Sequence, residues 1–124
     1  MRTTMSEATK EELAQGWLKA LTDVDHFYEI CAPDCRVWHS ADDKWMSLKA
    51  AIDAVHDRGG LPEFTNSRVT ITEKGFFAQT SGVLKPQGED GPEVKVHLIQ
   101  IATVEGGKVV QAEEYIGPET DLAV

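Results

Sequence analysis

The second half of the chain is a run of strand-like segments joined by short connections. Four segments are rich in β-branched and aromatic residues: 68–73, 76–84, 94–104 and 108–116. Lys74-Gly75 joins the first two, residues 87–92 form a longer loop, and Gly106-Gly107 joins the last two. Because connections this short cannot carry the chain back across a sheet, successive strands must run in opposite directions. The pattern predicts an antiparallel meander.

The first half instead repeats its apolar residues at helical spacing. Thr9 and Glu12 have the spacing of a capping box, and Leu13, Trp17 and Leu21 follow on one helical face. A second short helix is expected over residues 27–31, ending before Pro33, and a short strand over 36–40. Ser47 is expected to cap a third helix that ends at Gly59-Gly60.

Helices followed by antiparallel strands are typical of an α+β fold, with the helices packed on one face of a curved sheet. The chain has 124 residues, about the size of one domain. We expect that domain over residues 9–118, with residues 1–8 and 119–124 as flexible termini. Both faces of the strands carry apolar residues, so we expect both to be covered.

Composition excludes several classes of partner. Twelve Lys and Arg against 21 Asp and Glu give a net charge of −9, which repels nucleic acid and anionic membranes. There is no apolar stretch of membrane-spanning length and no signal-peptide core, which predicts a cytoplasmic protein. Cys31 and Cys35 are then expected to be reduced thiols rather than a disulfide, because nothing indicates secretion. A zinc site is not expected, because it would need two further ligands at close spacing.

Two sequence runs carry a resemblance to a known family. They are Ala32-Pro33-Asp34-Cys35-Arg36-Val37-Trp38-His39 and the final Gly-Lys-Val-Val-Gln-Ala-Glu-Glu-Tyr-Ile. Together with the order of elements, they resemble the nuclear-transport-factor-2-like superfamily, in its SnoaL-like and ketosteroid-isomerase-like branch, over residues 9–118. The resemblance implies a cystatin-like cone, in which a strongly curved antiparallel sheet wraps around the N-terminal helices and encloses an apolar pocket. The superfamily includes isomerases, cyclases, dehydratases, epoxide hydrolases and binding modules, so the fold does not specify a reaction.

The resemblance also implies site residues. His39 matches the general base of ketosteroid isomerases, an Asp at the end of the first strand. Trp17 and Ile99 match the Tyr and Asp that stabilise the enolate in those enzymes, and neither is such a donor, so steroid isomerisation is not expected. Thr80 matches the Arg of the epoxide-hydrolase set, of which only Glu114 keeps an acid, so that mechanism is not expected either.

Three side chains are candidates for catalysis. His39 titrates near neutral pH and would act as the base that removes a proton next to a carbonyl. His97 would donate a hydrogen bond to the developing oxyanion, since alternation groups it with Ile99 and Ile101, on the face that the resemblance implies is turned to the pocket. Glu114 would orient a histidine or return the proton; its neighbour Glu113 is the alternative, because one of the two must face inward. Purely structural roles remain open for each: a strand cap, a hydrogen-bonded core histidine and an exposed acidic strand edge.

The expected ligand is a small apolar or aromatic molecule, such as a polyketide- or steroid-like ring system. Trp17, Ile99, Thr80 and Trp38 are the expected substrate-binding residues. No metal and no cofactor is expected. The chain would be an isomerase, cyclase or lyase; the alternative is a non-catalytic ligand-binding or dimerisation module of the same fold.

A homodimer is also expected, formed through the back of the sheet. Alternation groups an apolar set on that face: Val83, Val96, Leu98, Phe77 and Tyr115. A patch of this kind is seldom left in water on a monomer, and a two-fold partner would cover it with its own copy.

Overall fold

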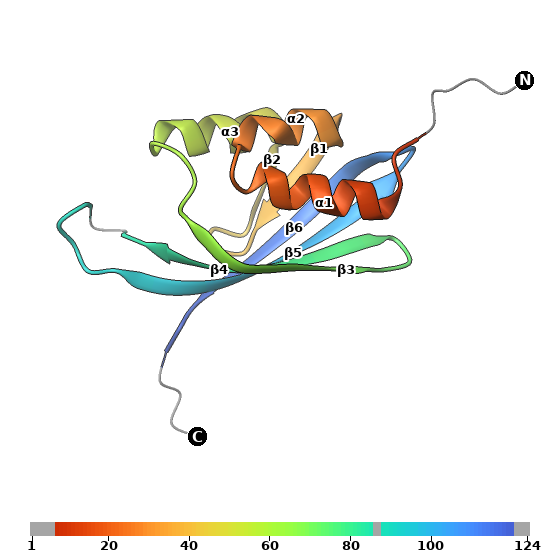
Figure 1. The fold of residues 1–124 in the computed structure, drawn as a ribbon. Helices are drawn as coiled ribbons and strands as arrows, with labels where there is room; N and C mark the ends of the chain where they lie inside the picture. Colours follow the sequence, from red (N-terminus) through yellow and green to blue (C-terminus); the bar gives the residue numbers. More distant parts are fainter. Residues whose placement is uncertain (1–6, 86–87, 121–124) are drawn as a thin grey trace, which may run out of the picture.

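A computed structural model of the chain describes residues 7–85 and 88–120. Its helices are α1 (Lys10–Ala20), a 3₁₀ turn η1 (Val24–His26), the single-turn α2 (Phe27–Ile30) and, after the first two strands, α3 (Leu48–Asp57). Six strands make one sheet: β1 (Cys31–His39), β2 (Lys44–Ser47), β3 (Phe64–Ile71), β4 (Gly75–Leu84), β5 (Val94–Glu105) and β6 (Lys108–Pro118). This is the predicted α+β class, with a curved sheet that does not close into a barrel (Figure 1).

The strand order is β2-β1-β6-β5-β4-β3. β3, β4, β5 and β6 pair antiparallel in sequence order, which is the predicted meander. β1 pairs with β6 in parallel, and β2 pairs with β1 antiparallel. The parallel pair joins β1, the first strand in the sequence, to β6, the last.

Local sequence accounts for the helices. In α1 the Thr9 hydroxyl accepts from the Glu12 backbone N–H, and the Glu12 carboxylate accepts from the Thr9 N–H, so the predicted capping box is present. The Ser47 side chain caps α3 as predicted, by accepting from the Ala50 N–H. Each helix then turns its apolar stripe toward the sheet.

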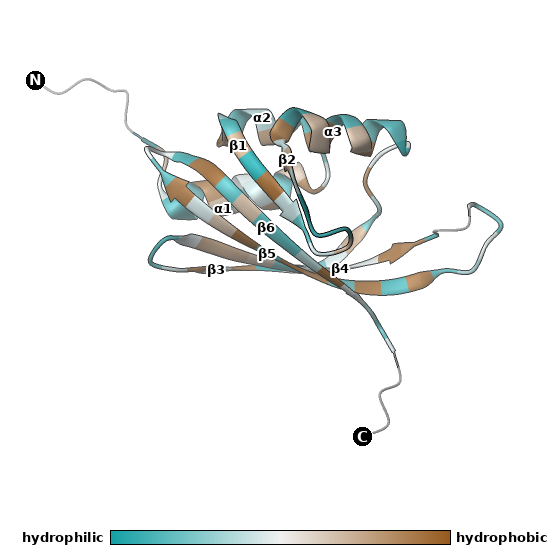
Figure 2. Ribbon diagram, turned by 180° about the vertical axis from the view of Figure 1, so that it is seen from behind, coloured by the Kyte–Doolittle hydropathy of each residue, from teal (hydrophilic) through white to brown (hydrophobic). Residues whose placement is uncertain are grey.

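The helices all lie on one face of the sheet, here called the inner face (Figure 1). The core is formed between them, and its most buried large side chains are Phe76, Val109 and Cys35. Figure 2 shows hydrophobic positions along the central strands and on the helices above them. The opposite, outer face carries no helix in the described part of the chain.

Three details of the elements differ from prediction. Cys31 opens β1 instead of closing the second helix, β2 was not expected, and β3 begins at Phe64 rather than at Arg68. β2 is a short edge strand opened by the polar turn that contains Asp43, at φ 54°. In β1 and β3 the residues that were not predicted as strand precede a β-bulge, which lies before Arg36 in β1 and before Arg68 in β3.

The predicted alternation along β5 is present, but the two sets of residues were assigned to the wrong faces. Val96 and Leu98 are buried on the inner face, whereas His97, Ile99 and Ile101 point outward. Both sets contain apolar residues, so hydrophobicity alone does not identify the inner one; burial against the helices does. The expected back-face patch therefore loses Val96 and Leu98, which lie beneath the helices.

The outer face has its own apolar surface. We define the outer-face strip as six neighbouring side chains on β2, β1, β6, β5 and β4: Trp45, Trp38, Tyr115, Ile99, Ile101 and Phe77. The rings of Trp38 and Tyr115 are 5.1 Å apart between centroids. Trp45 and Tyr115 are exposed and the other four are half-buried.

Within the described residues, no helix is both long and apolar enough to cross a membrane. The predicted flexible termini lie mostly outside the described residues, at 1–6 and 121–124. Glu7 and Glu119, which are described, both contact the domain: Glu7 lies against Gly107, and the Glu119 N–H donates to the Lys95 carbonyl.

The hairpin between β3 and β4 requires glycine at position 75. A Cβ built there would lie 2.0 Å from the Ala102 carbonyl oxygen on β5, and backbone cannot move aside. We expect Gly75→Ala to lower the free energy of unfolding by about 1–3 kcal/mol or more. Gly117→Ala is the matched control, because its Cβ meets nothing within 4 Å. Urea denaturation of both variants measures this, and equal stabilities would contradict the packing described.

Candidate functional site

A cavity of about 960 Å³ lies between the inner face of the sheet and the helices. Its lining is mainly apolar and includes side chains from α1, α3, β5 and β6, among them Trp17, Ile52, Leu98 and Ile116. A few polar groups interrupt it, chiefly His39, Glu114, Gln100 and Arg58. A large apolar cavity with few polar groups is the usual form of a small-molecule site.

Two of the three predicted catalytic side chains meet in this cavity. His39 ends β1 and Glu114 lies opposite it on β6, because the parallel register pairs them directly. His39 Nε2 is 3.4 Å from Glu114 Oε2, and both side chains are about three-quarters buried. The Glu114 carboxylate raises the pKa of His39 above its ordinary value, although desolvation opposes this. Asp42 also raises that pKa and Arg58 lowers it.

The sheet register adds a third polar group to the same row. Gln100 on β5 is paired with Glu114, which is paired with His39, so an amide, a carboxylate and an imidazole lie side by side on the inner face. Gln100 is only 6% exposed. Sequence reasoning missed it, although it is the single polar residue among the alternate positions Val96, Leu98 and Ala102.

A buried hydrogen bond fixes the orientation of that amide. The Trp17 indole Nε1–H donates to Gln100 Oε1 over 2.7 Å, linking α1 to the centre of the sheet. The Trp17 ring is itself held edge-on by Phe27 and Phe76, at centroid distances of 4.8 and 5.7 Å. With its oxygen occupied, Gln100 is left with its NH₂ group for another partner.

That NH₂ group faces the cavity. Among the described residues, the Gln100 amide nitrogen has no protein acceptor. It is nevertheless not among the fully buried side-chain atoms that lack a hydrogen-bond partner, since there are none in the described chain. The amide nitrogen therefore keeps accessible surface, and the accessible space beside Gln100 is the cavity that it lines. A fixed donor next to an imidazole–carboxylate pair is suited to holding a ligand oxygen.

His97, the third predicted catalytic residue, does not reach the cavity. It lies on the outer face with its side chain 59% exposed, where Ser81 contacts its Nδ1 at 2.9 Å and Glu119 its Nε2 at 3.1 Å. The physical reason is the pleat: its neighbours Val96 and Leu98 occupy the inner face, so His97 must point away. The expected convergence of three groups holds for His39 and Glu114 only.

The predicted substrate-binding residues divide between the two faces. Trp17 lines the cavity. Thr80 is buried on the inner face, but its hydroxyl is bound to the Thr65 carbonyl and to Ser67 on β3, beneath the β3 bulge. Ile99 and Trp38 belong to the outer-face strip, so the expectation that they line the pocket is wrong.

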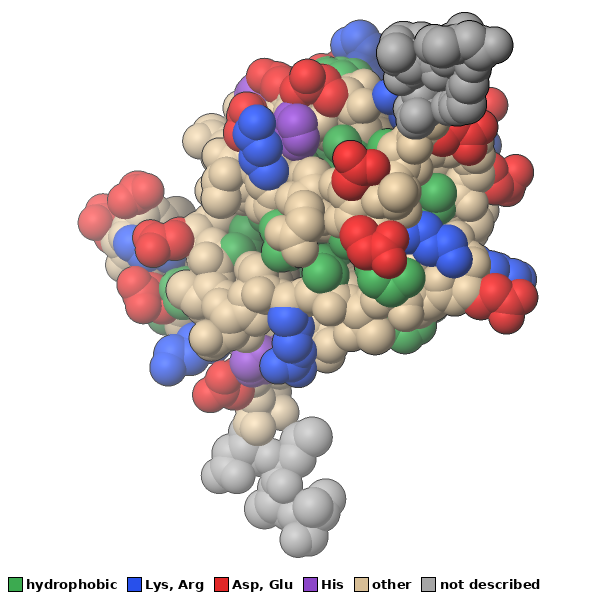
Figure 3. Space-filling model, turned by 45° about the vertical axis from the view of Figure 1, so that its right-hand side comes forward, with side chains coloured by type: hydrophobic (Ala, Val, Ile, Leu, Met, Phe, Trp, Pro, Cys, Tyr) green, Lys and Arg blue, Asp and Glu red, His purple; other side chains and the backbone are tan. Residues whose placement is uncertain are grey.

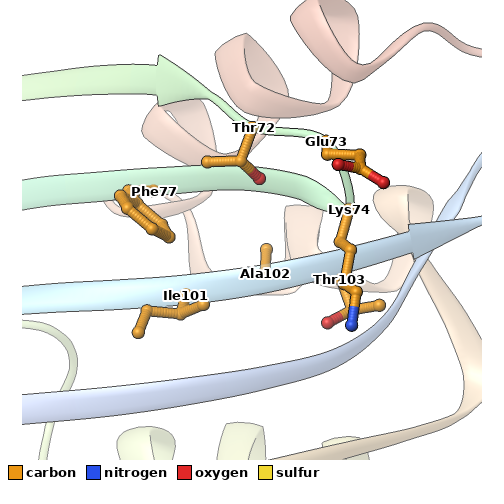
Figure 4. A pocket seen from close by; sticks show the side chains of 7 residues that line it. All are labelled: Thr72, Glu73, Lys74, Phe77, Ile101, Ala102 and Thr103. Carbon is orange, nitrogen blue, oxygen red and sulfur yellow. The ribbon is translucent and has the colours of Figure 1, made fainter.

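A second, smaller hollow of about 330 Å³ lies near the Lys74 turn (Figure 4). Phe77 and Ile101 lie side by side there, with Lys74 and Thr103 at one end. It has one carboxylate and one ammonium but no histidine, and it continues the outer-face strip. The larger cavity, which holds the acid–base pair, is therefore the candidate functional site.

The face of the molecule shown in Figure 3 carries mixed charge. Figure 3 shows basic side chains interspersed with acidic ones on the face that it presents, rather than gathered in one area. Among the described residues, no group of three or more His, Cys, Asp or Glu side chains is placed to hold a metal ion.

Comparison with known proteins identifies the fold. No protein-family profile and no curated protein matches the chain. Solved structures do match: a nuclear-transport-factor-2-like protein of unknown function from Burkholderia xenovorans has a TM-score of 0.66 and 17% identity, over 90% of this chain and 88% of its own. A candidate SnoaL-like polyketide cyclase from Mesorhizobium loti has a TM-score of 0.69 and 16% identity, over 86% and 98%.

A candidate polyketide cyclase from Pseudomonas putida has a TM-score of 0.70 and 12% identity, over 86% of this chain and 90% of its own. At these identities the matches establish a shared fold and leave the chemistry to be argued from the cavity.

The Trp17–Gln100 pair can be tested by a double-mutant cycle. Trp17→Phe leaves the buried Gln100 oxygen without a donor, so we expect it to lower the free energy of unfolding by about 1–3 kcal/mol beyond the loss of ring volume. Adding Gln100→Leu removes the orphaned oxygen, so the second substitution should cost less in Trp17→Phe than in the wild type. Denaturant unfolding of the four proteins measures the coupling, and purely additive losses would contradict it.

Proposed function

We propose that this chain, which has the nuclear-transport-factor-2-like fold of the SnoaL-like cyclases, is an isomerase, cyclase or lyase that removes a proton next to a carbonyl. The observation that carries the proposal is the His39–Glu114 pair, at 3.4 Å, inside a mainly apolar cavity. An imidazole base held beside a carboxylate in a mainly apolar cavity is suited to such chemistry.

His39 is the base in this proposal. Its Nε2 is the ring nitrogen nearest Glu114, so the neutral imidazole carries its proton there and presents Nδ1 as the basic atom. Glu114 orients the ring and stabilises the imidazolium formed when Nδ1 takes the substrate proton. The returning proton then comes from the same nitrogen, and no cofactor is needed for this transfer.

Gln100 supplies the second function, stabilisation of the substrate oxygen. Its NH₂ group, fixed by Trp17, would donate to the carbonyl and hold the negative charge that develops on enolisation. The substrate would then lie across Glu114, with its oxygen toward β5 and its acidic carbon toward β1.

The substrate class follows from the lining. Trp17, Phe27, Leu98 and Ile116 present apolar and aromatic surface, and about 960 Å³ admits a molecule of several fused rings. A small aromatic or polyketide-like ketone fits this lining better than a charged metabolite does.

Proton exchange provides a direct test with a simple probe, the aromatic ketone 2-tetralone. We expect the protein to accelerate exchange of its α-protons with D₂O, followed by NMR, and His39→Gln to reduce the rate about 10²–10⁴-fold. His56→Gln is the matched control, since this exposed histidine pairs with Asp25 outside the cavity. Binding of the ketone without exchange would favour the non-catalytic alternative.

The pH dependence has a defined sign. Glu114 raises the pKa of His39 above about 6.5, the ordinary histidine value. As the pH falls through that raised pKa, His39 becomes protonated and can no longer act as a base, so the exchange rate should fall. Glu114→Gln should move the acid limb to lower pH. NMR titration of the imidazole and the rate profile should agree; an unchanged His39 pKa in the variant would contradict the pairing.

A homodimer is also part of the proposal, formed through the outer-face strip. Its aromatic and aliphatic side chains surround Glu113, which is paired with Trp38 and Ile101 and accepts from the Tyr115 hydroxyl; a copy of the same strip is a self-complementary partner. The net charge of −9 opposes association, so salt should strengthen it.

Placing a charge in the strip tests the dimer. Ile101→Glu should shift the sedimentation coefficient at micromolar concentration from a dimer to a monomer, since a buried unpaired carboxylate is strongly unfavourable. Ala50→Glu adds the same charge to an exposed position on α3 and should leave the dimer intact. A wild-type monomer at these concentrations would refute the interface.

A further inference from the structure

Cys31 and Cys35 form a close pair that the proposed proton transfer does not use. Both are free thiols, 4% and 1% exposed, and both line the cavity that holds His39. A molecule inside the cavity therefore contacts a thiol pair that bulk solvent does not reach.

The β1 bulge explains why the two side chains meet. In a regular strand, residues four apart are separated by about 13 Å. Here Cys31 is paired with Val109 and Arg36 with Gln111, so five steps along β1 correspond to two along β6, or about 7 Å. The register shift falls between Cys31 and Arg36, where Pro33 has no N–H to contribute to a strand pairing. Cys35, next to Arg36, is thereby returned toward Cys31.

The two thiols are close enough for each to change the pKa of the other, and Cys35 Sγ lies 3.8 Å from the Arg36 carbonyl oxygen. The hydrogen bond from Cys31 lowers the pKa of Cys35, although burial and Asp34 oppose this. The same hydrogen bond raises the pKa of Cys31, with burial acting in the same direction. Of the two thiols, Cys35 is therefore the more acidic. This division of roles is that of a nucleophilic cysteine and a resolving cysteine.

We propose that Cys31 and Cys35 are a disulfide-forming pair that reduces apolar organic hydroperoxides entering the cavity. The Cys35 thiolate attacks the terminal peroxide oxygen: an S–O bond forms, the O–O bond breaks, and the alkoxide leaves as the alcohol after taking a proton. Cys31 sulfur then attacks the sulfenic sulfur of Cys35, an S–S bond forms, and hydroxide leaves with the Cys31 proton as water. The two thiols supply both electrons, and an external thiol restores them.

The geometry fits this product. A disulfide requires Cα atoms about 4.4–6.8 Å apart, which the bulge approaches and a regular strand does not. The ring closed by the bond would contain only the bulge, so the rest of β1, including His39, keeps its pairing with β6. This inference is independent of the proton-transfer function, because His39→Gln leaves both thiols in place.

Cumene hydroperoxide is the probe, with hydrogen peroxide as its comparison. Wild-type protein treated with cumene hydroperoxide should lose both titratable thiols and a mass of two hydrogen atoms, reversibly with dithiothreitol. The apolar peroxide should react about tenfold faster than hydrogen peroxide at equal concentration, because its phenyl group binds in the cavity. Cys31→Ser should stop at the sulfenic acid, which dimedone traps, and Cys35→Ser should consume no peroxide.

Three results would overturn the assignment. They are retention of both thiols in treated wild-type protein, disulfides formed only between two chains on a non-reducing gel, and hydrogen peroxide reacting as fast as cumene hydroperoxide. The wild-type measurements need no substitution, so they remain decisive even where a buried Cys→Ser variant does not fold.

Discussion

The parallel pairing of β1 with β6 is the contact on which the rest of the molecule depends. It joins residues 31–39 to residues 109–114 and places β1, together with β2, at one side of the meander. Without it the β3–β6 hairpins would still form, but the inner face would have no wall under α3. The same register sets His39 opposite Glu114, so one pairing both closes the cavity and assembles the candidate acid–base pair.

The buried indole–amide hydrogen bond has a comparable role at the opposite side of the cavity. Trp17 comes from the first helix and Gln100 from the centre of the sheet, and both side chains are buried. A buried donor or acceptor without a partner is costly, so the bond restricts how α1 can sit in the curved sheet. It also fixes the orientation of an amide that lines the cavity.

The sequence supports correct predictions wherever the signal is local. The Thr9–Glu12 capping box, the Ser47 cap and the glycine-containing turns each act within a few residues, and each is found as expected. Long-range pairing has no such signal, and neither β2 nor the two bulges was predicted. The face of β5 was misjudged because Ile99 and Ile101 are as apolar as Val96 and Leu98; exposed Lys95 was the better guide. His97 and Ile99 followed that error, and Gln100 was overlooked for the same reason.

Alternation along the strands also separates two kinds of change that such a protein can accumulate. On β5, Leu98 and Gln100 line the cavity while Ile99 and Ile101 face outward, so adjacent residues belong to two different surfaces. A substitution at Leu98 or Gln100 changes the cavity lining, and one at Ile99 or Ile101 changes the outer-face strip. The cavity lining and the outer surface can thus diverge independently within one strand, which gives a small domain two separate routes to change.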